Sequence, residues 1–317
     1  KLTYDYSIHY PFYLTPFVEY SYGLSSIQNN QTFNISKLSF GILVNYGINN
    51  LKLFWHNLSI LSMKALYIIL ILVYTSQSQP LRTIENNAFG FGEKLEYEIG
   101  YKFLKAGTGY FEVASQPVAY KGNQCYDVNF VVKSLSSLEW IYKVRDSYRT
   151  LIDVNGIFPW RYAQRIREGN YKRDIVTEFD QNRNKAITKK GNYKTPPFVH
   201  DIVSAFFYIR TLDLKKYNKG DIIPLKNFYK DSTYNLDVKV LGRETIEVKA
   251  GKFKTIIVEP LVKEGGLFKS EGRIIIWMSD DDRKIPVKVG TEILIGFVGA
   301  ELTKYSGLRG KLDAKIE

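Results

Sequence analysis

Three side chains near the middle of the chain have the types needed for hydrolytic chemistry. His200, Asp201 and Ser204 could form a serine, histidine and aspartate triad, provided that the histidine lies between the nucleophile and the orienting carboxylate. A helix start explains the same residues, because Asp201 is a favoured N-cap residue and its negative charge suits the helix dipole. Ser204 also lacks the Gly-x-Ser-x-Gly pattern of a nucleophile elbow. The sequence therefore favours a capped helix and leaves a hydrolase as an alternative.

Three consecutive acidic residues, Asp280, Asp281 and Asp282, could bind a hard cation such as calcium through their carboxylates. Adjacent residues on a turn point in different directions, however, and the spaced ligands of a calcium-binding loop are missing. His200 is the single histidine between residues 79 and 317, which excludes a multi-histidine site there. We therefore expect a hairpin tip at 280–282, and we predict no metal site, no cofactor and no catalytic residue.

Aromatic side chains gather at the ends of the expected strands and on the expected helix. A curved sheet lined by such side chains can enclose an apolar ligand, with the helix acting as a lid. An ordinary packed core would use the same residues. Arg165 and Arg167 share one face of a strand by alternation and could pair with an anionic head group. The residues predicted to bind a ligand are Trp140, Tyr142, Arg165, Arg167, Phe206, Phe207 and Trp277.

The elements that must hold these side chains are mostly strands. Residues 95–101 alternate between apolar and polar positions, as in a sheet that is covered on one face. Turn residues recur about every 8–12 residues, which is typical of antiparallel sandwiches and barrels. One segment differs, because Ile202, Ala205 and Ile209 follow a helical period. We predict a mainly β fold of strongly curved antiparallel sheets, barrel-like or a sandwich, with one short α-helix near 201–213.

A stretch that begins at Met63 has the layout of a secretory signal peptide. Lys64 supplies a positive charge, residues 65–73 are apolar, and the small and polar residues that follow fit a cleavage site. This apolar run is short for a membrane-spanning helix, which needs about 20 residues. We predict a signal helix near 63–74 within a signal peptide at 63–78, and therefore an exported protein. A retained N-terminal membrane anchor and a buried core helix are the alternatives.

The leading segment, residues 1–50, is rich in Tyr, Phe, Asn and Ser. Residues 17–22 and 38–46 fit two strands with a polar turn between them. Long aromatic strands joined by polar hairpins are typical of outer-membrane β-barrels. We expect an outer-membrane-barrel-like fragment that was joined to the chain by upstream read-through, with a genuine β extension as the alternative. The signal peptide and a single β-rich envelope domain at 79–317 would then follow.

The chain is basic, with 44 Lys and Arg against 32 Asp and Glu. Without residues 1–78 the counts become 40 and 30, because that segment holds four Lys and two acidic residues. A net charge of +10 that is spread along the domain suits contact with lipid, lipopolysaccharide or acidic glycan, although a solvated surface without a partner would show the same charge. No helix-turn-helix or zinc-finger spacing is present, so we do not expect nucleic acid as a partner.

Several short motifs occur in an order that resembles a known bacterial family. They are Phe91-Gly92-Glu93-Lys94, Lys105-Ala106-Gly107-Thr108-Gly109, Asp153-Val154-Asn155-Gly156, His200-Asp201-Ile202-Val203-Ser204-Ala205-Phe206-Phe207, Gly251-Lys252-Phe253-Lys254 and Ile276-Trp277-Met278-Ser279-Asp280. Over about residues 91–305 the chain resembles the domain-of-unknown-function family 3108 (DUF3108). The resemblance implies an exported, envelope-located, β-rich protein, and it transfers no catalytic residues. Residues 1–50 lie outside it.

Together these observations favour a non-catalytic protein that binds a lipid or an anionic envelope component. The expected location is the periplasm or cell envelope of a Gram-negative bacterium, since the chain carries an export signal and a basic domain. An interaction protein in envelope assembly, with other envelope proteins as partners, is one alternative, and a hydrolase is another.

Overall fold

The computed structural model describes residues 2–3, 6–9, 12–20, 38–46, 81–101, 104–262, 273–293 and 296–316. The chain divides into two compact units, Lys1–Gln77 and Ser78–Glu317. Within the described residues, no helix is both long and apolar enough to cross a membrane. The predicted signal peptide at 63–78, with its helix near 63–74, lies outside the described residues.

The first unit contains a four-stranded antiparallel sheet. Strand β3 (Phe12–Tyr20) pairs with β1 (Leu2–Thr3), β2 (Tyr6–His9) and β4 (Leu38–Tyr46). The strand predicted at 38–46 is therefore confirmed, and the one predicted at 17–22 begins five residues earlier and ends at Tyr20. These strands are the part of the leading segment that the structure describes.

In the second unit, the described residues form one antiparallel sheet of sixteen strands. We call β5 to β13 the first arm. Its strands are β5 (Lys94–Tyr101), β6 (Leu104–Val113), β7 (Val118–Tyr120), β8 (Asn123–Ser134), β9 (Arg145–Asp153), β10 (Pro159–Glu168), β11 (Tyr171–Asp180), β12 (Lys185–Thr188) and β13 (Gly191–Lys194). We call β14 to β20 the second arm. Its strands are β14 (Ile222–Ile223), β15 (Lys226–Tyr229), β16 (Ser232–Val248), β17 (Gly251–Val262), β18 (Ile274–Ser279), β19 (Pro286–Ile293) and β20 (Gly296–Ser306).

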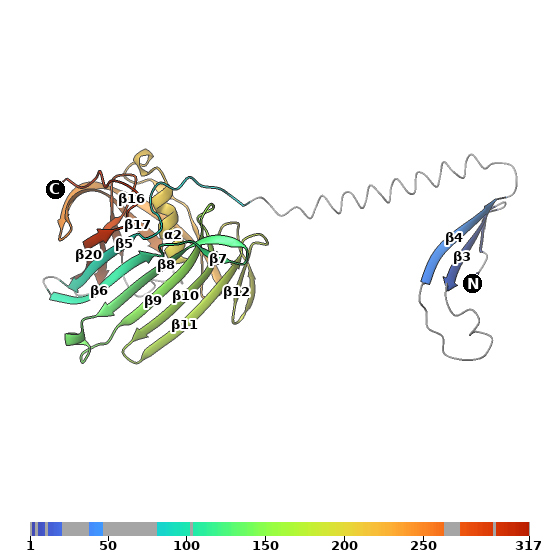
Figure 1. Cartoon of the computed structure of the whole chain (residues 1–317), viewed down its shortest axis with the longest axis horizontal. Helices are drawn as coiled ribbons and strands as arrows, with labels where there is room; N and C mark the ends of the chain where they lie inside the picture. Colours follow the sequence, from blue (N-terminus) through green and yellow to red (C-terminus); the bar gives the residue numbers. More distant parts are fainter. Residues whose placement is uncertain are drawn as a thin grey trace. The chain divides into compact units, whose positions relative to one another are not determined.

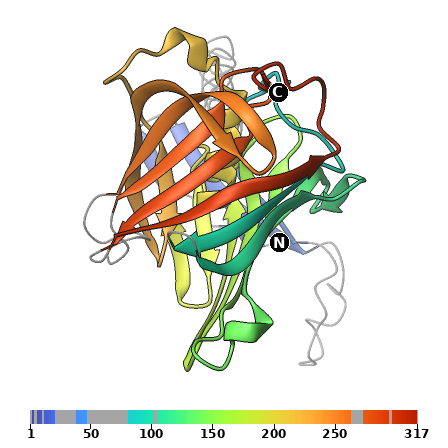
Figure 2. The same cartoon turned by 90° about the vertical axis from the view of Figure 1, so that its left-hand side faces the viewer.

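The two arms are joined where β5 pairs with β20, and from there each arm runs outward strand by strand. The sheet curls on itself without closing, as Figures 1 and 2 show. Bulges help this curvature because an extra residue bends a strand and increases its twist. One lies in β16 between Val240 and Gly242, where Gly242 adopts a φ of 139° that suits glycine. The predicted fold class of curved antiparallel sheet is thus confirmed, and the barrel-like form is the one observed.

Alternation along the strands decides which side chains face the inside of the curl. In β16, Leu236, Val238 and Val240 are buried, whereas the intervening residues are partly exposed. In β10, Tyr162 and Ile166 are buried in the same way. A sheet that is covered on one face requires this period of two, because successive side chains point to opposite faces.

The predicted helix is α2 (Ile202–Thr211), and it lies between the two arms. Its side chains Val203 and Phe207 pack in a cluster built mainly from the first arm. Ala205 and Ile209 pack in a cluster built from the second arm. The helix therefore fills the inside of the curl and connects both halves. Two short 3-10 helices, Ser136–Leu138 and Leu214–Lys216, complete the described helical segments.

Residues 81–93 precede β5 and cross one end of the curled sheet; we call this segment the strap. Arg82 donates to the carbonyls of Gly156 and Ile157 at 2.8 and 3.0 Å. The Asn86 amide donates to the Tyr126 hydroxyl at 3.3 Å, and Phe89 is fully buried. The strap thereby fixes the ends of first-arm strands to the helix.

Candidate ligand cavity

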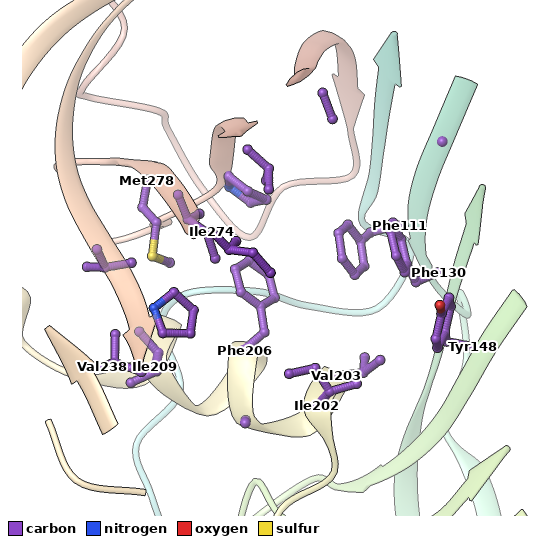
Figure 3. A pocket seen from close by; sticks show the side chains of 18 of the residues that line it. Phe111, Phe130, Tyr148, Ile202, Val203, Phe206, Ile209, Val238, Ile274 and Met278 are labelled. Carbon is purple, nitrogen blue, oxygen red and sulfur yellow. The ribbon is translucent and has the colours of Figure 1, made fainter. Parts of the chain in front are cut away.

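A cavity of about 290 Å³ lies on the inner face of the curled sheet, beside helix α2 (Figure 3). The first arm, the second arm and the helix all contribute to its wall. The lining residues are all apolar or aromatic: Tyr97, Ile99, Gly109, Phe111, Phe130, Tyr148, Ile202, Val203, Ala205, Phe206, Ile209, Leu225, Leu236, Val238, Val258, Pro260, Ile274, Ile276, Met278, Pro286, Val289 and Ala300.

The described lining contains no charged side chain, and its side-chain polar groups are two tyrosine hydroxyls. The Tyr97 hydroxyl donates to the carbonyl of Pro286 at 2.8 Å, so it is already bound to the protein. Burial raises the pKa of Tyr97 well above its ordinary value, and the group stays neutral. Such a wall offers contact and water exclusion rather than polar recognition, which suits hydrocarbon.

Phe206 is the aromatic residue that the helix projects into this space, as Figure 3 shows. Its ring centre lies 5.5 Å from that of Phe111, and Phe111 stacks on Phe130 at 4.2 Å. Phe130 in turn lies 5.5 Å from Tyr148. All four rings remain partly exposed. The first-arm side of the cavity is therefore a continuous aromatic wall that a ligand could reach.

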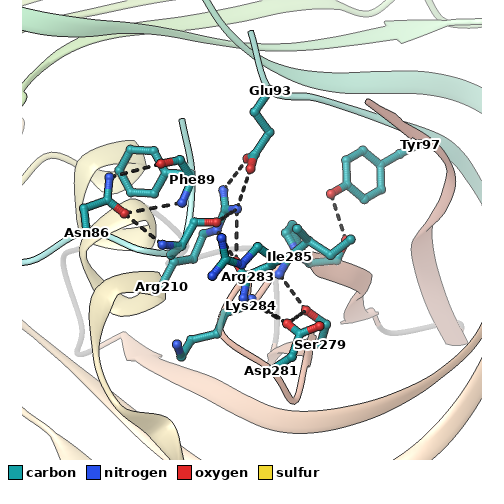
Figure 4. A network of polar contacts seen from close by, with 12 residues as sticks. Asn86, Phe89, Glu93, Tyr97, Arg210, Ser279, Asp281, Arg283, Lys284 and Ile285 are labelled. Carbon is teal, nitrogen blue, oxygen red and sulfur yellow. Dashed lines mark hydrogen bonds and ion pairs between the residues drawn. The ribbon is translucent and has the colours of Figure 1, made fainter. Parts of the chain in front are cut away.

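A buried ion pair holds the helix that forms this wall (Figure 4). Arg210 contacts both carboxylate oxygens of Glu93, at 2.6 and 2.9 Å, and both side chains are fully buried. Arg210 also donates to the carbonyls of Arg283 and Ala88. One side chain therefore ties together the helix, the strap and the β18–β19 turn. A buried arginine needs such partners, because an unpaired buried charge is very costly.

The residues considered for hydrolysis are buried at the start of α2. The Asp201 carboxylate accepts from the backbone N–H groups of Val203 and Ser204 and from the Thr150 hydroxyl at 2.6 Å. The Ser204 hydroxyl accepts from the Asp201 N–H at 3.0 Å, which completes a capping box. Among the described contacts, none joins the Asp201 carboxylate to His200. The carboxylate therefore caps the helix and does not orient the histidine.

The tautomer of His200 is also wrong for a general base, because the ring nitrogen nearest Ser204 carries the proton. Its Nε2 lies 3.2 Å from Arg82 Nη2, and an arginine can only donate. Nε2 must then accept, so Nδ1 carries the proton and donates toward Ser204 Oγ at 3.3 Å. A triad needs the opposite, with the imidazole accepting the serine proton. The predicted helix cap is confirmed, and this geometry does not form the triad.

The three aspartates of the β18–β19 turn diverge. Asp281 accepts from the Ser279 hydroxyl at 2.8 Å and from the N–H groups of Arg283, Lys284 and Ala314. Asp280 pairs with Arg243 at 3.1 Å, and Asp282 lies exposed near Lys215. The hairpin tip predicted at 280–282 is therefore observed. Within the described residues, no group of three metal-ligating side chains converges.

The cavity brings together few of the residues predicted to bind a ligand. Phe206 lines it, whereas Phe207 is buried in the core beside Phe89 and Arg210. Trp277 lies between the lining residues Ile276 and Met278 and bonds to Glu244, outside the lining.

The other four predicted residues lie away from the cavity lining. Arg165 is exposed, and Arg167 pairs with Asp174 at 2.8 Å. Both alternate with the buried Ile166, so they face the outside of the curl. Trp140 and Tyr142 are exposed in the loop between β8 and β9.

Sequence reasoning missed most of the cavity wall, because that wall is largely aliphatic. Val238, Val258, Ile274 and Ile276 follow the same alternation as ordinary core residues. Alternation could have shown that these side chains point inward. It could not show that the space opposite them is left open.

Comparison with known proteins places the chain in a family. Solved structures with a similar fold are distant: a β-barrel-like DUF1849 protein from Brucella abortus shares 9% identity at a TM-score of 0.44, with 71% of this chain and 98% of that chain covered. A candidate lipoprotein from Parabacteroides distasonis shares 11% sequence identity at a TM-score of 0.31, with 72% of this chain and 100% of that chain covered. A candidate exported protein with a YmcC-like fold from Bacteroides fragilis shares 10% sequence identity at a TM-score of 0.30, with 72% of this chain and 100% of that chain covered.

Among curated proteins, none matches the chain. The family model described as "Protein of unknown function (DUF3108)" matches residues 96–303. That match covers more than half of the 317 residues and agrees with the resemblance predicted over 91–305. The chain therefore belongs to the DUF3108 family.

Proposed function

We propose that the protein binds the hydrocarbon part of a lipid, or a similarly apolar ligand, in the cavity beside α2. The observation that carries this proposal is the lining itself, which is wholly apolar or aromatic and comes from both arms and the helix. Burying apolar ligand surface against such a wall is worth about 25 cal/mol per Å² of area removed from water. Partly exposed aromatic rings in the wall supply surface that a ligand would cover.

The size of the cavity limits what it could hold. Ligand pockets usually enclose about 300–1,000 Å³, and this cavity of about 290 Å³ lies at the lower end of that range. It therefore suits one acyl chain or a similar apolar group better than a whole phospholipid. A polar head group would remain outside, because the lining residues that the structure describes offer it no charged partner.

We propose the cell envelope as the place where this binding occurs. The support is the signal-like stretch at 63–78, with its lysine, apolar run and small polar residues. The basic domain would suit the anionic lipids and glycans found there. Cell fractionation of the full chain, followed by mass spectrometry of the mature N-terminus, tests this location. Material in the cytoplasm with an intact Met63 would contradict it.

Ligand capture can be tested directly on the purified protein. Organic extraction and mass spectrometry should recover a co-purified lipid, and an environment-sensitive fatty-acid probe should bind saturably. The variant Ala300→Phe places a ring in the cavity and should weaken probe binding at least about tenfold, a loss of about 1.4 kcal/mol. The matched variant Ala119→Phe changes an exposed strand residue and should bind normally.

Two results would overturn the proposal. One is a delipidated protein that binds no apolar probe. The other is equal weakening by Ala300→Phe and Ala119→Phe, since only the first side chain lines the cavity. Unfolding curves of both variants show whether each remains folded, so a folding failure cannot be mistaken for a blocked cavity.

A further inference from the structure

One end of the curled sheet presents large apolar side chains to solvent. The loop 135–144 joins β8 to β9, and the turn 169–170 joins β10 to β11. The N–H of Gly169 donates to the carbonyl of Lys143 at 2.8 Å, so the loop and the turn lie together. The N–H of Leu135 donates to the carbonyl of Ala106, which brings the start of β6 to the same place. We call this end of the sheet the rim.

The rim holds five of the nine exposed large hydrophobic residues in the described part of the chain. Their exposed fractions are 82% for Trp140, 63% for Ile141, 53% for Tyr142, 52% for Tyr171 and 73% for Leu104. Single exposed apolar residues are ordinary, but a group at one end of a molecule marks an interaction surface. Three of them, Trp140, Ile141 and Tyr142, are consecutive in one loop.

The rim is also basic. Residues 133–145 and 165–174 hold seven Lys and Arg against three Asp and Glu, a net charge of +4. Glu139 is already paired with Arg145 at 3.0 Å and with Lys143 at 3.4 Å. These ion pairs are exposed and therefore weak, so the cations stay available to another anion. The rim thus combines a basic surface with exposed tryptophan and tyrosine side chains.

Bilayer interfaces favour this combination. Trp and Tyr are enriched there because an apolar ring with one polar group suits the head-group level. Each Lys or Arg near an anionic bilayer adds about fivefold to partitioning. A protein partner would suit the apolar residues equally, but the basic charge around them is complementary to anionic head groups. We propose that the rim docks on an anionic phospholipid bilayer, with Trp140 and Ile141 inserted among the lipids.

Docking at the rim does not depend on the proposed cavity ligand, but it would bring the cavity close to a source of acyl chains. Phe130 and Tyr148 line the cavity and lie four and three residues from the ends of β8 and β9 at the rim. At about 3.3 Å per residue, the cavity wall begins roughly 10–13 Å from these strand ends. An acyl chain would then have a short path between the two.

A site-specific label tests the docking in the full chain. Burial raises the pKa of the Cys125 thiol to about 12, so the native cysteine stays unlabelled. An environment-sensitive fluorophore is placed at Ile141→Cys, and a control label is placed at Lys311→Cys, an exposed residue of the C-terminal segment. Each protein is mixed with phosphatidylcholine vesicles, or with vesicles of equal parts phosphatidylcholine and phosphatidylglycerol.

We expect the label at position 141 to shift to the blue and to be quenched by spin-labelled lipid on the phosphatidylglycerol vesicles. The label at position 311 should remain in water. Because the readout is local, membrane binding by the apolar stretch 65–73 would not imitate it. Two single substitutions, Lys172→Gln and Arg165→Gln, should each weaken partitioning to the anionic vesicles about fivefold. The control substitution Lys311→Gln should leave it unchanged.

A label at position 141 that stays in water on both kinds of vesicle overturns the docking proposal. So does an equal response from both labels. A protein that fails to dock but still binds the fatty-acid probe would reject the rim alone, and one that docks but binds no probe would reject the cavity ligand alone.

Discussion

At the scale of single residues, buried polar groups decide what the start of α2 can do. His200 and Arg82 lie side by side, with three aromatic rings near the guanidinium. Burial lowers the pKa of Arg82 to about 10, which still leaves it charged near neutral pH. The imidazole between this cation and Ser204 must therefore stay neutral. These groups link the strap to the helix; His200 and Ser204 are buried, and Arg82 is partly buried.

This arrangement predicts a pH-dependent stability. Burial, and then repulsion by Arg82, holds the pKa of His200 well below its ordinary value. Below about pH 6.5 the unfolded chain takes up a proton that the folded state refuses. The stability that neutral His200 supports is therefore present above that pH and falls as the pH drops below it, by at most about 1.4 kcal/mol per pH unit.

Urea unfolding between about pH 7.5 and 5.5 measures this slope, and His200→Gln should flatten it. Burial raises the pKa of Asp201, which acts in the opposite sense, but Asp201 is present in both proteins and its contribution cancels in the comparison. His9 and His56 are present in both proteins, so the difference between the two curves reports His200 alone. An unchanged slope in the variant would refute the assignment.

At the scale of elements, helix α2 contributes one residue to the packed core and the neighbouring residue to the cavity wall. Phe207 is fully buried and contacts Phe89 at 4.7 Å between ring centres, so it holds the core. Phe206 is partly exposed and lines the cavity. A helix turns by about 100° per residue, which is enough to send adjacent side chains into a core and into an open space.

We therefore expect opposite results from two neighbouring substitutions. Phe207→Ala should lower the free energy of unfolding by about 3–5 kcal/mol, because it leaves a cavity in a packed core. Phe206→Ala should cost much less stability but weaken binding of the fatty-acid probe about two- to tenfold, since one aromatic contact contributes about 0.5–1.5 kcal/mol. Denaturant unfolding and probe titration distinguish them. A large stability loss from Phe206→Ala would show that its ring is part of the core.

At the scale of the whole second unit, contacts between segments that are distant in sequence hold the sheet in its curled form. The sheet does not close, so its two arms are tied by the β5–β20 pairing, by α2 and by the strap. Glu93 and Arg210 are 117 residues apart in sequence and meet in the interior. Arg210 also reaches the turn at Arg283, so the pair connects three distant segments (Figure 4).

Removing one partner of this pair should destabilise the unit broadly. Glu93→Gln leaves the Arg210 charge buried and only partly compensated, and it should lower the free energy of unfolding by about 3–5 kcal/mol. Glu112→Gln removes a comparable carboxylate from an exposed pair with Lys94 and should have little effect. Denaturant unfolding of both variants measures the contrast. Equal losses would mean that burial of the Glu93 pair is not what stabilises the curl.

Much of the fold could be predicted from local pattern. Alternation in 95–101 and the helical period from Ile202 to Ile209 identified strands and the helix α2, because each depends on which face of a segment is apolar. Asp201 was recognisable as a cap for the same local reason. The DUF3108 membership followed from the order of short motifs.

The candidate site was predicted far less well. Phe206 was identified as a ligand residue and does line the cavity, but the same evidence pointed to Phe207, which is packed in the core. Trp140 and Tyr142 were grouped with it as aromatic residues near strand ends, and they lie at the exposed rim. Aromatic content alone does not distinguish a core, a cavity and a rim, because all three use the same side chains.

By itself, the sequence determined that 79–317 would form curved antiparallel strands around one capped helix, and that the domain would be basic. Only the tertiary structure decided where space is left beside α2, how Glu93 meets Arg210, and which aromatic side chains remain in water. The physical reason is that periodicity and capping are properties of neighbouring residues, whereas a cavity, a buried ion pair and an exposed rim arise from segments that are distant in sequence.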